Sequence, residues 1–284
     1  MIEERRAADR SRLSAYSDLI YRALRASASR ADTLVGTLGI FLIGGLIVAA
    51  TGAAIFVELA DHVKAGTTQA FDESVIRWLG AHHSPALDAV MIEVTALGTG
   101  TVVLMVVTVA ALFLVLTQHK YSALLLLAST FGGIALNGVL KLGFDRPRPS
   151  IIVPVVHTVS SSFPSGHAMS AAIVYSTVAY LAARLHKRRW ARWLVMTAAL
   201  IVIALISFSR MYLGVHYPSD VIAGVVIGLA WAAFCMATLE AIQKFGARQD
   251  PRILTQEKPA PPDPRDPRDP AASPPIPAAS SRRR

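Results

Sequence analysis

The chain has a single cysteine and few charged residues, and each scarcity excludes a class of protein. Cys235 is the only thiol among 284 residues, so neither an intramolecular disulfide framework nor a cysteine-based zinc site is expected. Charged residues make up 17% of the chain and hydrophobic residues 53%. An ordinary soluble domain has about 25% and about 45–50%, respectively. The composition therefore excludes a soluble enzyme with a conventional core and indicates a protein embedded in lipid.

The scarcity of charge leaves six long runs of sequence without a charged residue. They are residues 34–57, 94–117, 121–140, 168–183, 193–209 and 221–239. A helix needs roughly 20 apolar residues to cross a hydrocarbon core of about 30 Å. Four runs reach or nearly reach that length, and the two shorter ones have neutral or amphipathic flanks. We therefore expect an all-α fold, a bundle of six transmembrane helices.

The lysines and arginines are distributed unevenly between the two ends of the expected spans. Most of the 28 lie before the first span, after the last, or in the loops that follow the second and fourth. Loops rich in these residues stay in the cytoplasm, so we expect a multi-pass protein of the inner (plasma) membrane with both termini cytoplasmic. The basic residues behind the net charge of +9 are then expected to set the orientation of the chain in the membrane and to contact anionic headgroups. Nucleic-acid binding is not expected. The outer face keeps only Lys64, Arg77, Lys141, Arg146, Arg148 and Arg210.

The expected membrane domain covers residues 34–240, with one segment before it, one after it, and a first outer loop within it. Residues 1–33 are a basic cytoplasmic segment, either an amphipathic helix on the inner membrane surface or an untethered arm. The first apolar run follows this segment and is too long for a signal peptide, so we expect an uncleaved span. In the outer loop, Phe71–Leu79 and Pro85–Ile92 are predicted to form short amphipathic helices. Residues 241–284 are rich in Pro and Arg and are predicted to be a disordered cytoplasmic tail.

Residues suited to binding phosphate gather at the outer ends of the third to sixth spans. Antiparallel packing brings these ends together, so the active site is expected within residues 141–220. Three cations there can neutralise a phosphate and its transition state without a metal. The free amides that open the fourth span can bind an anion, with Ser165 as N-cap and Gly166 permitting close approach. The expected phosphate-binding residues are Lys141, Arg148, Ser165, Gly166 and Arg210.

Two histidines in the same clusters can supply a nucleophile and an acid. Asp220 follows His216 at an offset that lets its carboxylate hold the second ring nitrogen, so His216 is the better nucleophile. His167 is then the general acid by elimination. No cofactor and no metal ligand set is expected.

The three clusters together resemble the three-part signature of the type 2 phosphatidic acid phosphatase superfamily, which comprises lipid phosphate phosphatases. That superfamily is related to vanadium-dependent haloperoxidases and bacterial acid phosphatases. The resemblance implies a phosphohistidine on His216, oriented by Asp220, with His167 as acid, a metal-free phosphate site, and vanadate as a transition-state mimic. The matching strings are Lys141-x6-Arg148-Pro149, Pro164-Ser165-Gly166-His167 and Ser209-Arg210-x5-His216-x3-Asp220.

The expected function is hydrolysis of a phosphate or diphosphate group on a membrane lipid at the outer leaflet. Undecaprenyl diphosphate, phosphatidylglycerol phosphate and phosphatidic acid are the candidate substrates. A lipid phosphotransferase that uses the same pocket is the alternative enzyme. A transporter or flippase is disfavoured because the spans are uncharged and the ionisable residues cluster at one face. No feature of the sequence selects among the lipids or indicates the oligomeric state.

Three positions outside the signature carry structural interpretations. Arg146 lies within the first cluster, and we expect it to face lipid headgroups or to pair on the surface with Asp145. Asn137, a polar residue deep in a span, is predicted to make an interhelical hydrogen bond. Gly224 and Gly228 are spaced as small residues are at a close helix contact.

Overall fold

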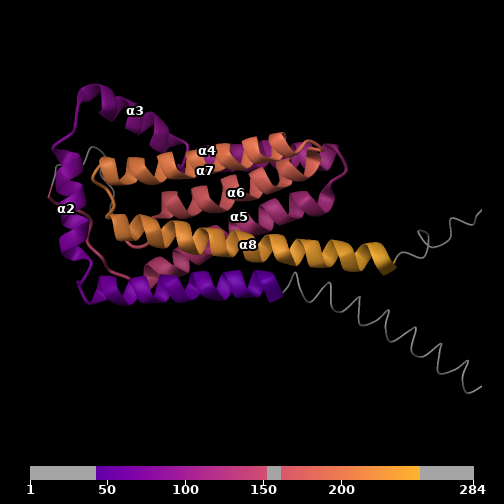
Figure 1. The fold of residues 1–284 in the computed structure, drawn as a ribbon, viewed down its shortest axis with the longest axis horizontal. Coiled ribbons are helices and arrows are strands. Elements are labelled where there is room, and N and C mark those ends of the chain that lie inside the picture. The colour runs from indigo at the N-terminus through magenta and orange to yellow at the C-terminus, as the bar shows by residue number, and fades with distance from the viewer. Residues whose placement is uncertain (1–42, 152–160, 250–284) are drawn as a thin grey trace, which may run out of the picture. The chain divides into compact units, whose positions relative to one another are not determined.

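The computed structural model describes residues 43–151 and 161–249, and all of the regular structure in those ranges is helical. The expected all-α class is therefore confirmed. The predicted segment at residues 1–33 lies outside the described residues. Of the tail predicted to be disordered, residues 241–249 instead continue the last helix, and the rest lies outside the described residues. A first helix, Ile43–Lys64, precedes α2 (Gln69–Gly80), α3 (Pro85–Ala96), α4 (Gly100–Leu116), α5 (Lys120–Leu142), α6 (Gly166–Leu185), α7 (Arg189–Tyr212) and α8 (Pro218–Gln249), as Figure 1 shows.

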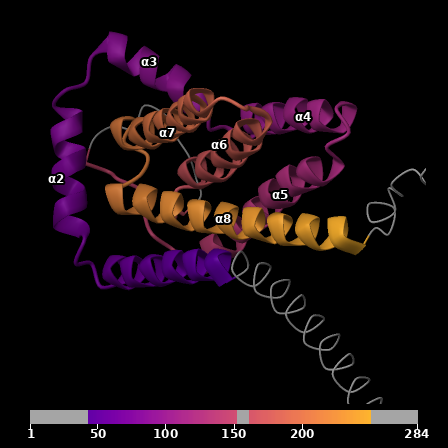
Figure 2. The same cartoon turned by 45° about the vertical axis from the view of Figure 1, so that its right-hand side comes forward.

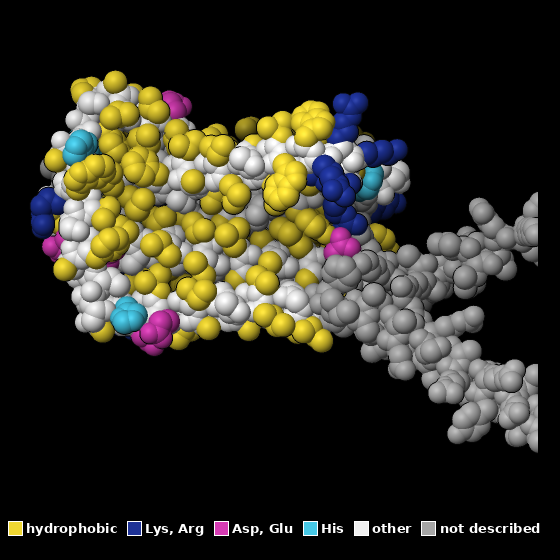
Figure 3. Space-filling view, in the orientation of Figure 1, with side chains coloured by type: hydrophobic (Ala, Val, Ile, Leu, Met, Phe, Trp, Pro, Cys, Tyr) yellow, Lys and Arg dark blue, Asp and Glu magenta, His cyan; other side chains and the backbone are white. Residues whose placement is uncertain are grey.

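Five of the described helices are long and apolar enough to cross a membrane. They are Ile43–Lys64, α5, α6, α7 and the Pro218–Ile242 part of α8. The pair α3 and α4 meets the same criteria jointly, but its two helices are bent by 46° at the break between them. The expected six spans are therefore present if this bent pair counts as one. Hydrophobic side chains cover most of the length of the bundle on the face shown in Figure 3, as a lipid environment requires.

The break between α3 and α4 falls inside the expected span at residues 94–117. α3 has Pro85 in its first turn, and its N-cap Ser84 accepts a hydrogen bond from the Leu87 amide at 3.4 Å. α4 has an N-cap of its own, Thr99, whose side chain accepts from the Val102 amide at 3.5 Å. The chain therefore forms two capped helices in place of one continuous span. α3 packs against α7, which brings the end of α3 to the site described below.

Small residues allow the helices to approach one another closely. A Cβ atom on Gly52 would lie 2.4 Å from Cβ of Ala230, and the first helix runs beside α8 in both ribbon views (Figures 1 and 2). Cβ atoms on Gly224 and Gly228 would lie 2.6 and 2.8 Å from backbone oxygens of α6. The predicted close helix contact at these two glycines is confirmed, and it fixes the start of α8 against the start of α6.

The two ends of the helical bundle differ in character. α2 lies across the end at which α6 and α8 begin and α7 finishes (Figures 1 and 2). Most of the Lys and Arg side chains visible in Figure 3 lie at the opposite end, where α6 ends and α7 begins. The short helices predicted at Phe71–Leu79 and Pro85–Ile92 correspond to α2 and α3, and α2 covers one end of the bundle.

Candidate active site

The turn between α7 and α8 places Arg210 and His216 side by side. Gly214 has a left-handed backbone, with φ of 69°, which a residue with a side chain rarely adopts. The turn folds back on α7, and the amides of Val215 and His216 donate to the Arg210 carbonyl over 3.2 and 3.3 Å. This geometry explains the spacing of the third cluster, because a fixed turn length returns the histidine to the arginine.

His216 and Asp220 form a buried pair, as predicted. Nδ1 of His216 lies 3.5 Å from Oδ2 of Asp220, and the two side chains are 2% and 0% exposed. The same Oδ2 accepts from the backbone amide of Tyr217 at 2.9 Å and from the hydroxyl of Ser162. Sequence reasoning missed Ser162, which stands in a run of serines with no spacing that marks it. The carboxylate thereby holds the imidazole through one nitrogen and leaves Nε2 to face the cations.

The three cations of the signature converge on that side of the imidazole. Nη1 of Arg148 lies 3.3 Å from Nε2 of His216 and donates to the Val215 carbonyl at 2.8 Å. Lys141, whose Nζ donates to the Ser161 carbonyl at 3.2 Å, interacts electrostatically with Arg148 and Arg210. These cations come from α5, from the loop after it and from α7, so their proximity is a product of the fold.

Burial and the nearby arginines keep His216 neutral. Burial, together with Arg148 and Arg210, lowers the pKa of the imidazole to about 4 against the opposing effect of the Asp220 carboxylate. A neutral imidazole has a free lone pair on one ring nitrogen, and a hydrogen bond from the other nitrogen selects which one. A neutral imidazole whose Nδ1 faces a carboxylate can use the lone pair of Nε2 as a nucleophile.

The start of α6 contributes its backbone and His167 to the same region. The amide of Ser165 donates to the Asp220 carbonyl at 3.0 Å, which joins the second and third clusters. His167 interacts electrostatically with His216 and with all three signature cations, so it lies within the group. Gly166 packs against the amide of Asn137, where a Cβ atom would lie 3.1 Å from Nδ2. The α6 N-terminus therefore opens onto the cation cluster, where its dipole favours an anion.

Several polar atoms at this end of the bundle are buried without a hydrogen-bond partner within the described part of the chain. They include Oγ of Ser165, Nε of Arg210 and Oδ1 of Asn137. For Asn137, the structure provides no partner for the oxygen of the predicted interhelical bond. Because buried polar atoms are nearly always paired in folded proteins, such a group of them marks a place for a polar ligand.

Arg146 is buried in ion pairs, and this corrects the expectation that it faces headgroups or pairs on the surface with Asp145. Its Nη1 lies 2.5 Å from Oδ1 of Asp220, and its Nη2 lies 2.8 Å from Oδ2 of Asp72. Burial by itself lowers the pKa of the guanidinium, but Asp220 and Asp72 outweigh it and hold that pKa above its ordinary value. Asp72 was missed as well, because its partner lies far away in sequence, on the other side of two spans.

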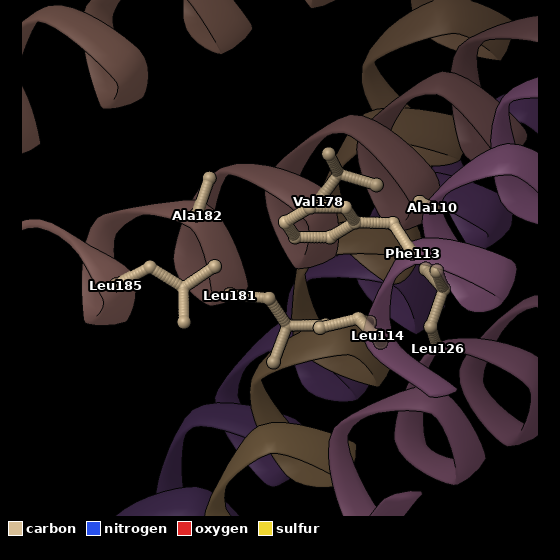
Figure 4. Close-up of a pocket in the computed structure, with 8 residues that line it drawn as sticks. All are labelled: Ala110, Phe113, Leu114, Leu126, Val178, Leu181, Ala182 and Leu185. Atoms are coloured by element: carbon tan, nitrogen blue, oxygen red, sulfur yellow. The ribbon is translucent and has the colours of Figure 1, made fainter. Parts of the chain in front are cut away.

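The described residues contain no group of three His, Cys, Asp or Glu side chains arranged to hold a metal ion. The expectation of a metal-free reaction stays a prediction. A pocket of about 90 Å³ lies between α4, α5 and α6, as Figure 4 shows, and apolar side chains such as Phe113, Leu126 and Leu181 line it. It lies toward the end away from His216 and offers no group for a phosphate.

Known proteins are similar to this chain in both sequence and fold. The family model described as the PAP2 superfamily matches residues 122–244. Phosphatidylglycerophosphatase B of Bacillus subtilis (strain 168) is 32% identical over 196 residues, which are 67% of this chain and 94% of that protein. Undecaprenyl-diphosphatase BcrC of the same strain is 27% identical over 159 residues, covering 52% of this chain and 73% of the relative.

A solved structure supports the same assignment. The crystal structure of a transmembrane PAP2-type phosphatidylglycerolphosphate phosphatase from Bacillus subtilis matches with a TM-score of 0.66 and 31% identity. The match covers 69% of this chain and 98% of that one. The resemblance carried by the three clusters is thereby confirmed over nearly the whole length of a relative. This chain belongs to the PAP2 superfamily and is a multi-pass membrane lipid phosphatase.

Proposed function

We propose that the protein removes a phosphate group from a membrane lipid through a phosphohistidine intermediate on His216. The observation that carries this proposal is the buried His216–Asp220 pair, in which the second ring nitrogen of His216, Nε2, lies 3.3 Å from Nη1 of Arg148. A nucleophile oriented by a second group and set beside cations is the arrangement that covalent phosphoryl transfer requires.

In the first step, Nε2 of His216 attacks the terminal phosphorus, and the bond from that phosphorus to the ester oxygen, or to the bridging oxygen of a diphosphate, breaks. His167 donates a proton to the departing oxygen, so that the lipid leaves as an alcohol or, from a diphosphate, as a monophosphate. The phosphorylated imidazole keeps its proton on Nδ1 and becomes cationic. The Asp220 carboxylate then stabilises that charge, since it lies 3.5 Å from Nδ1.

In the second step, water attacks the phosphohistidine. His167 now accepts a proton from this water, the bond between phosphorus and Nε2 breaks, and inorganic phosphate leaves. His216 returns to its neutral form, and both histidines are ready for another cycle.

The phosphate itself is bound by Lys141, Arg148 and Arg210 and by the first amides of α6. Arginine contacts two phosphate oxygens through a rigid fork, whereas lysine acts as a point charge. Oγ of Ser165 and Nε of Arg210, which lack partners within the described residues, are available to the phosphate oxygens. These groups neutralise the transition state without a metal, so a chelator such as EDTA is expected to leave activity unchanged.

Phosphatidylglycerol phosphate is the first substrate that we propose, followed by undecaprenyl diphosphate and phosphatidic acid. The similarity to the phosphatidylglycerophosphatase covers 94% of that protein, compared with 73% of the undecaprenyl-diphosphatase. We further propose an inner (plasma) membrane location with both termini cytoplasmic and the active site on the outer face. The excess of Lys and Arg at the opposite end of the bundle supports this orientation.

The test is phosphate release by purified protein from a panel of these three lipids, without any added acceptor. Release by the wild type supports a hydrolase, whereas a strict requirement for an acceptor identifies a phosphotransferase. His216→Ala should abolish release and also the acid-labile protein-bound phosphate that rapid quenching traps. His119→Ala, at the other end of the bundle, is the matched control. Retained turnover in His216→Ala overturns the mechanism.

A further inference from the structure

Arg146 joins the proposed nucleophile to α2 through two buried carboxylates. Its Nη1 lies 2.5 Å from Oδ1 of Asp220 and 2.7 Å from Oγ of Ser219. Its Nη2 lies 2.8 Å from Oδ2 of Asp72 and 3.3 Å from Oε1 of Gln69. Both Nη groups are therefore occupied by protein atoms.

Asp72, the second carboxylate, belongs to α2, which lies across the end of the bundle (Figures 1 and 2). Its side chain is fully buried. Oδ1 accepts from the amide of Ser219 at 3.0 Å, and Oδ2 accepts from the hydroxyl of that serine at 2.5 Å. Ser219 is the second residue of α8, so Asp72 caps the helix that carries Asp220 and complements its dipole.

The two oxygens of Asp220 are divided between different partners. Oδ2 faces His216, Ser162 and the amide of Tyr217, while Oδ1 faces Arg146. A carboxylate held at both oxygens cannot rotate, so the oxygen that meets Nδ1 of His216 has a fixed direction. The ring of Tyr217 stacks on the guanidinium, with its centroid 4.4 Å from Cζ, and this contact fixes the plane of Arg146 in turn.

We propose that Arg146 and Asp72 are positioning residues for the phosphoryl-transfer step, which act through Asp220 and do not touch the substrate. The inference rests on the proposed function, because it assigns to Asp220 the orientation of His216. It makes α2, which contains none of the signature residues, a working part of the active site. The effect of Arg146 on catalysis can be distinguished from an effect on phosphate binding, since both Nη groups of Arg146 form hydrogen bonds with protein atoms.

The first test measures kcat and KM for Arg146→Gln and Asp72→Asn on the most active lipid of the panel. We expect kcat to fall about 10- to 100-fold for Arg146→Gln, by analogy with groups that orient metal-bound histidines, with KM within about threefold. The kcat of Asp72→Asn should fall less, because the amide oxygen of the asparagine still accepts a hydrogen bond from Ser219. Arg77→Gln is the matched control, since Arg77 is an exposed arginine of α2, the helix that carries Asp72.

The second test separates positioning from a general contribution to folding. Arg146→Gln is combined with Asp220→Asn, and its effect on kcat is compared in the two backgrounds. If Arg146 acts through the charge of Asp220, its loss changes kcat by less than about threefold once Asp220 is neutral. An equal fold-loss in both backgrounds overturns the inference.

Folding of each variant is checked by its elution as a single species in detergent and by its melting curve. Should Arg146→Gln not fold, Arg146→Lys keeps the charge but cannot reach both carboxylates with a planar fork. The kcat of Arg146→Lys is expected to be lower than that of the wild type, and an unchanged kcat in that folded variant also overturns the inference. Failure of the proposed function is distinct, because then His216→Ala itself retains phosphate release.

Discussion

Thr95, at the end of α3, accepts a hydrogen bond from Nη1 of Arg210, near the end of α7, over 2.9 Å. Both side chains are buried, and Nε of the same guanidinium has no partner within the described residues. The contact ties a cation of the proposed phosphate site to the bend between α3 and α4. Thr95 therefore sets the direction in which Arg210 presents its remaining N–H groups.

Replacing Thr95 with Val removes this acceptor and keeps the shape of the side chain. Hydrogen bonds to charged groups contribute about 1.5–3 kcal/mol, so we expect the inhibition constant of inorganic phosphate to rise by about tenfold. Thr101→Val, at an exposed position of α4, is the control and should leave that constant unchanged. A lower melting temperature with an unchanged inhibition constant would mean that the contact serves only the fold.

Gly98, in the break between α3 and α4, allows the chain to pass against His167. A Cβ atom there would lie 2.7 Å from Cγ2 of Ile206 and 3.2 Å from Cδ2 of His167. Gly98→Ala is therefore expected to cost about 1–3 kcal/mol of stability and to lower kcat, because the imidazole must shift. Melting curves and kcat of the purified protein measure both effects.

Gly100 provides the control for this substitution. A Cβ atom at Gly100 would meet nothing within 4 Å, so Gly100→Ala should be neutral or stabilising by up to about 1 kcal/mol. Equal losses in the two alanine variants would show that crowding against His167 is not the cause.

The signature residues could be predicted from the sequence because each stands at a fixed offset from a helix end. The spacing from Arg210 to His216 is the length of one turn that folds back on α7, and that from His216 to Asp220 is one turn of helix. Local geometry of this kind survives in a single sequence. It also explains why the general form of the fold, apolar spans with their polar ends gathered, was predictable.

The supporting layer could not be predicted, because its contacts join residues far apart in the chain. Arg146 and Asp72 are 74 positions apart, and no periodicity indicates that α2 turns a carboxylate inward. Because Asp145 lies beside it in the sequence, Arg146 was interpreted as a surface residue. The bend at Gly98 was not predicted for another reason: the hydropathy averaged over residues 94–117 does not reveal that one helix ends and another begins there.

Arg148 lies beside the nitrogen that we propose as the nucleophile, with Nη1 at 3.3 Å from Nε2 of His216. Vanadate resembles the trigonal-bipyramidal transition state of phosphoryl transfer, so we expect it to inhibit and to bind through Arg148. Arg148→Gln should weaken inhibition by vanadate about 10- to 100-fold, and Arg148→Lys should restore part of it as a point charge. Arg77→Gln is the control, and a vanadate constant within twofold of wild type in Arg148→Gln would contradict this role.

The pH dependence of activity should report the environment of His216. An imidazolium has no lone pair on Nε2, so kcat/KM should fall tenfold per pH unit once the pH drops below the pKa of about 4. The Asp220 carboxylate raises this pKa, and Arg148 lowers it. Asp220→Asn should therefore move the acid limb to lower pH, and Arg148→Gln should move it to higher pH.

Because the two variants are expected to shift the acid limb in opposite directions, ionisation of the substrate cannot account for the result. A lipid phosphate itself titrates near pH 6, but that ionisation is the same for every variant and cancels when the profiles are compared. Full recovery of activity after return to pH 7 excludes unfolding as the source of the limb. If both variants shift the limb in the same direction, or if neither shifts it, the group that titrates in the acid limb is not the imidazole between Asp220 and Arg148.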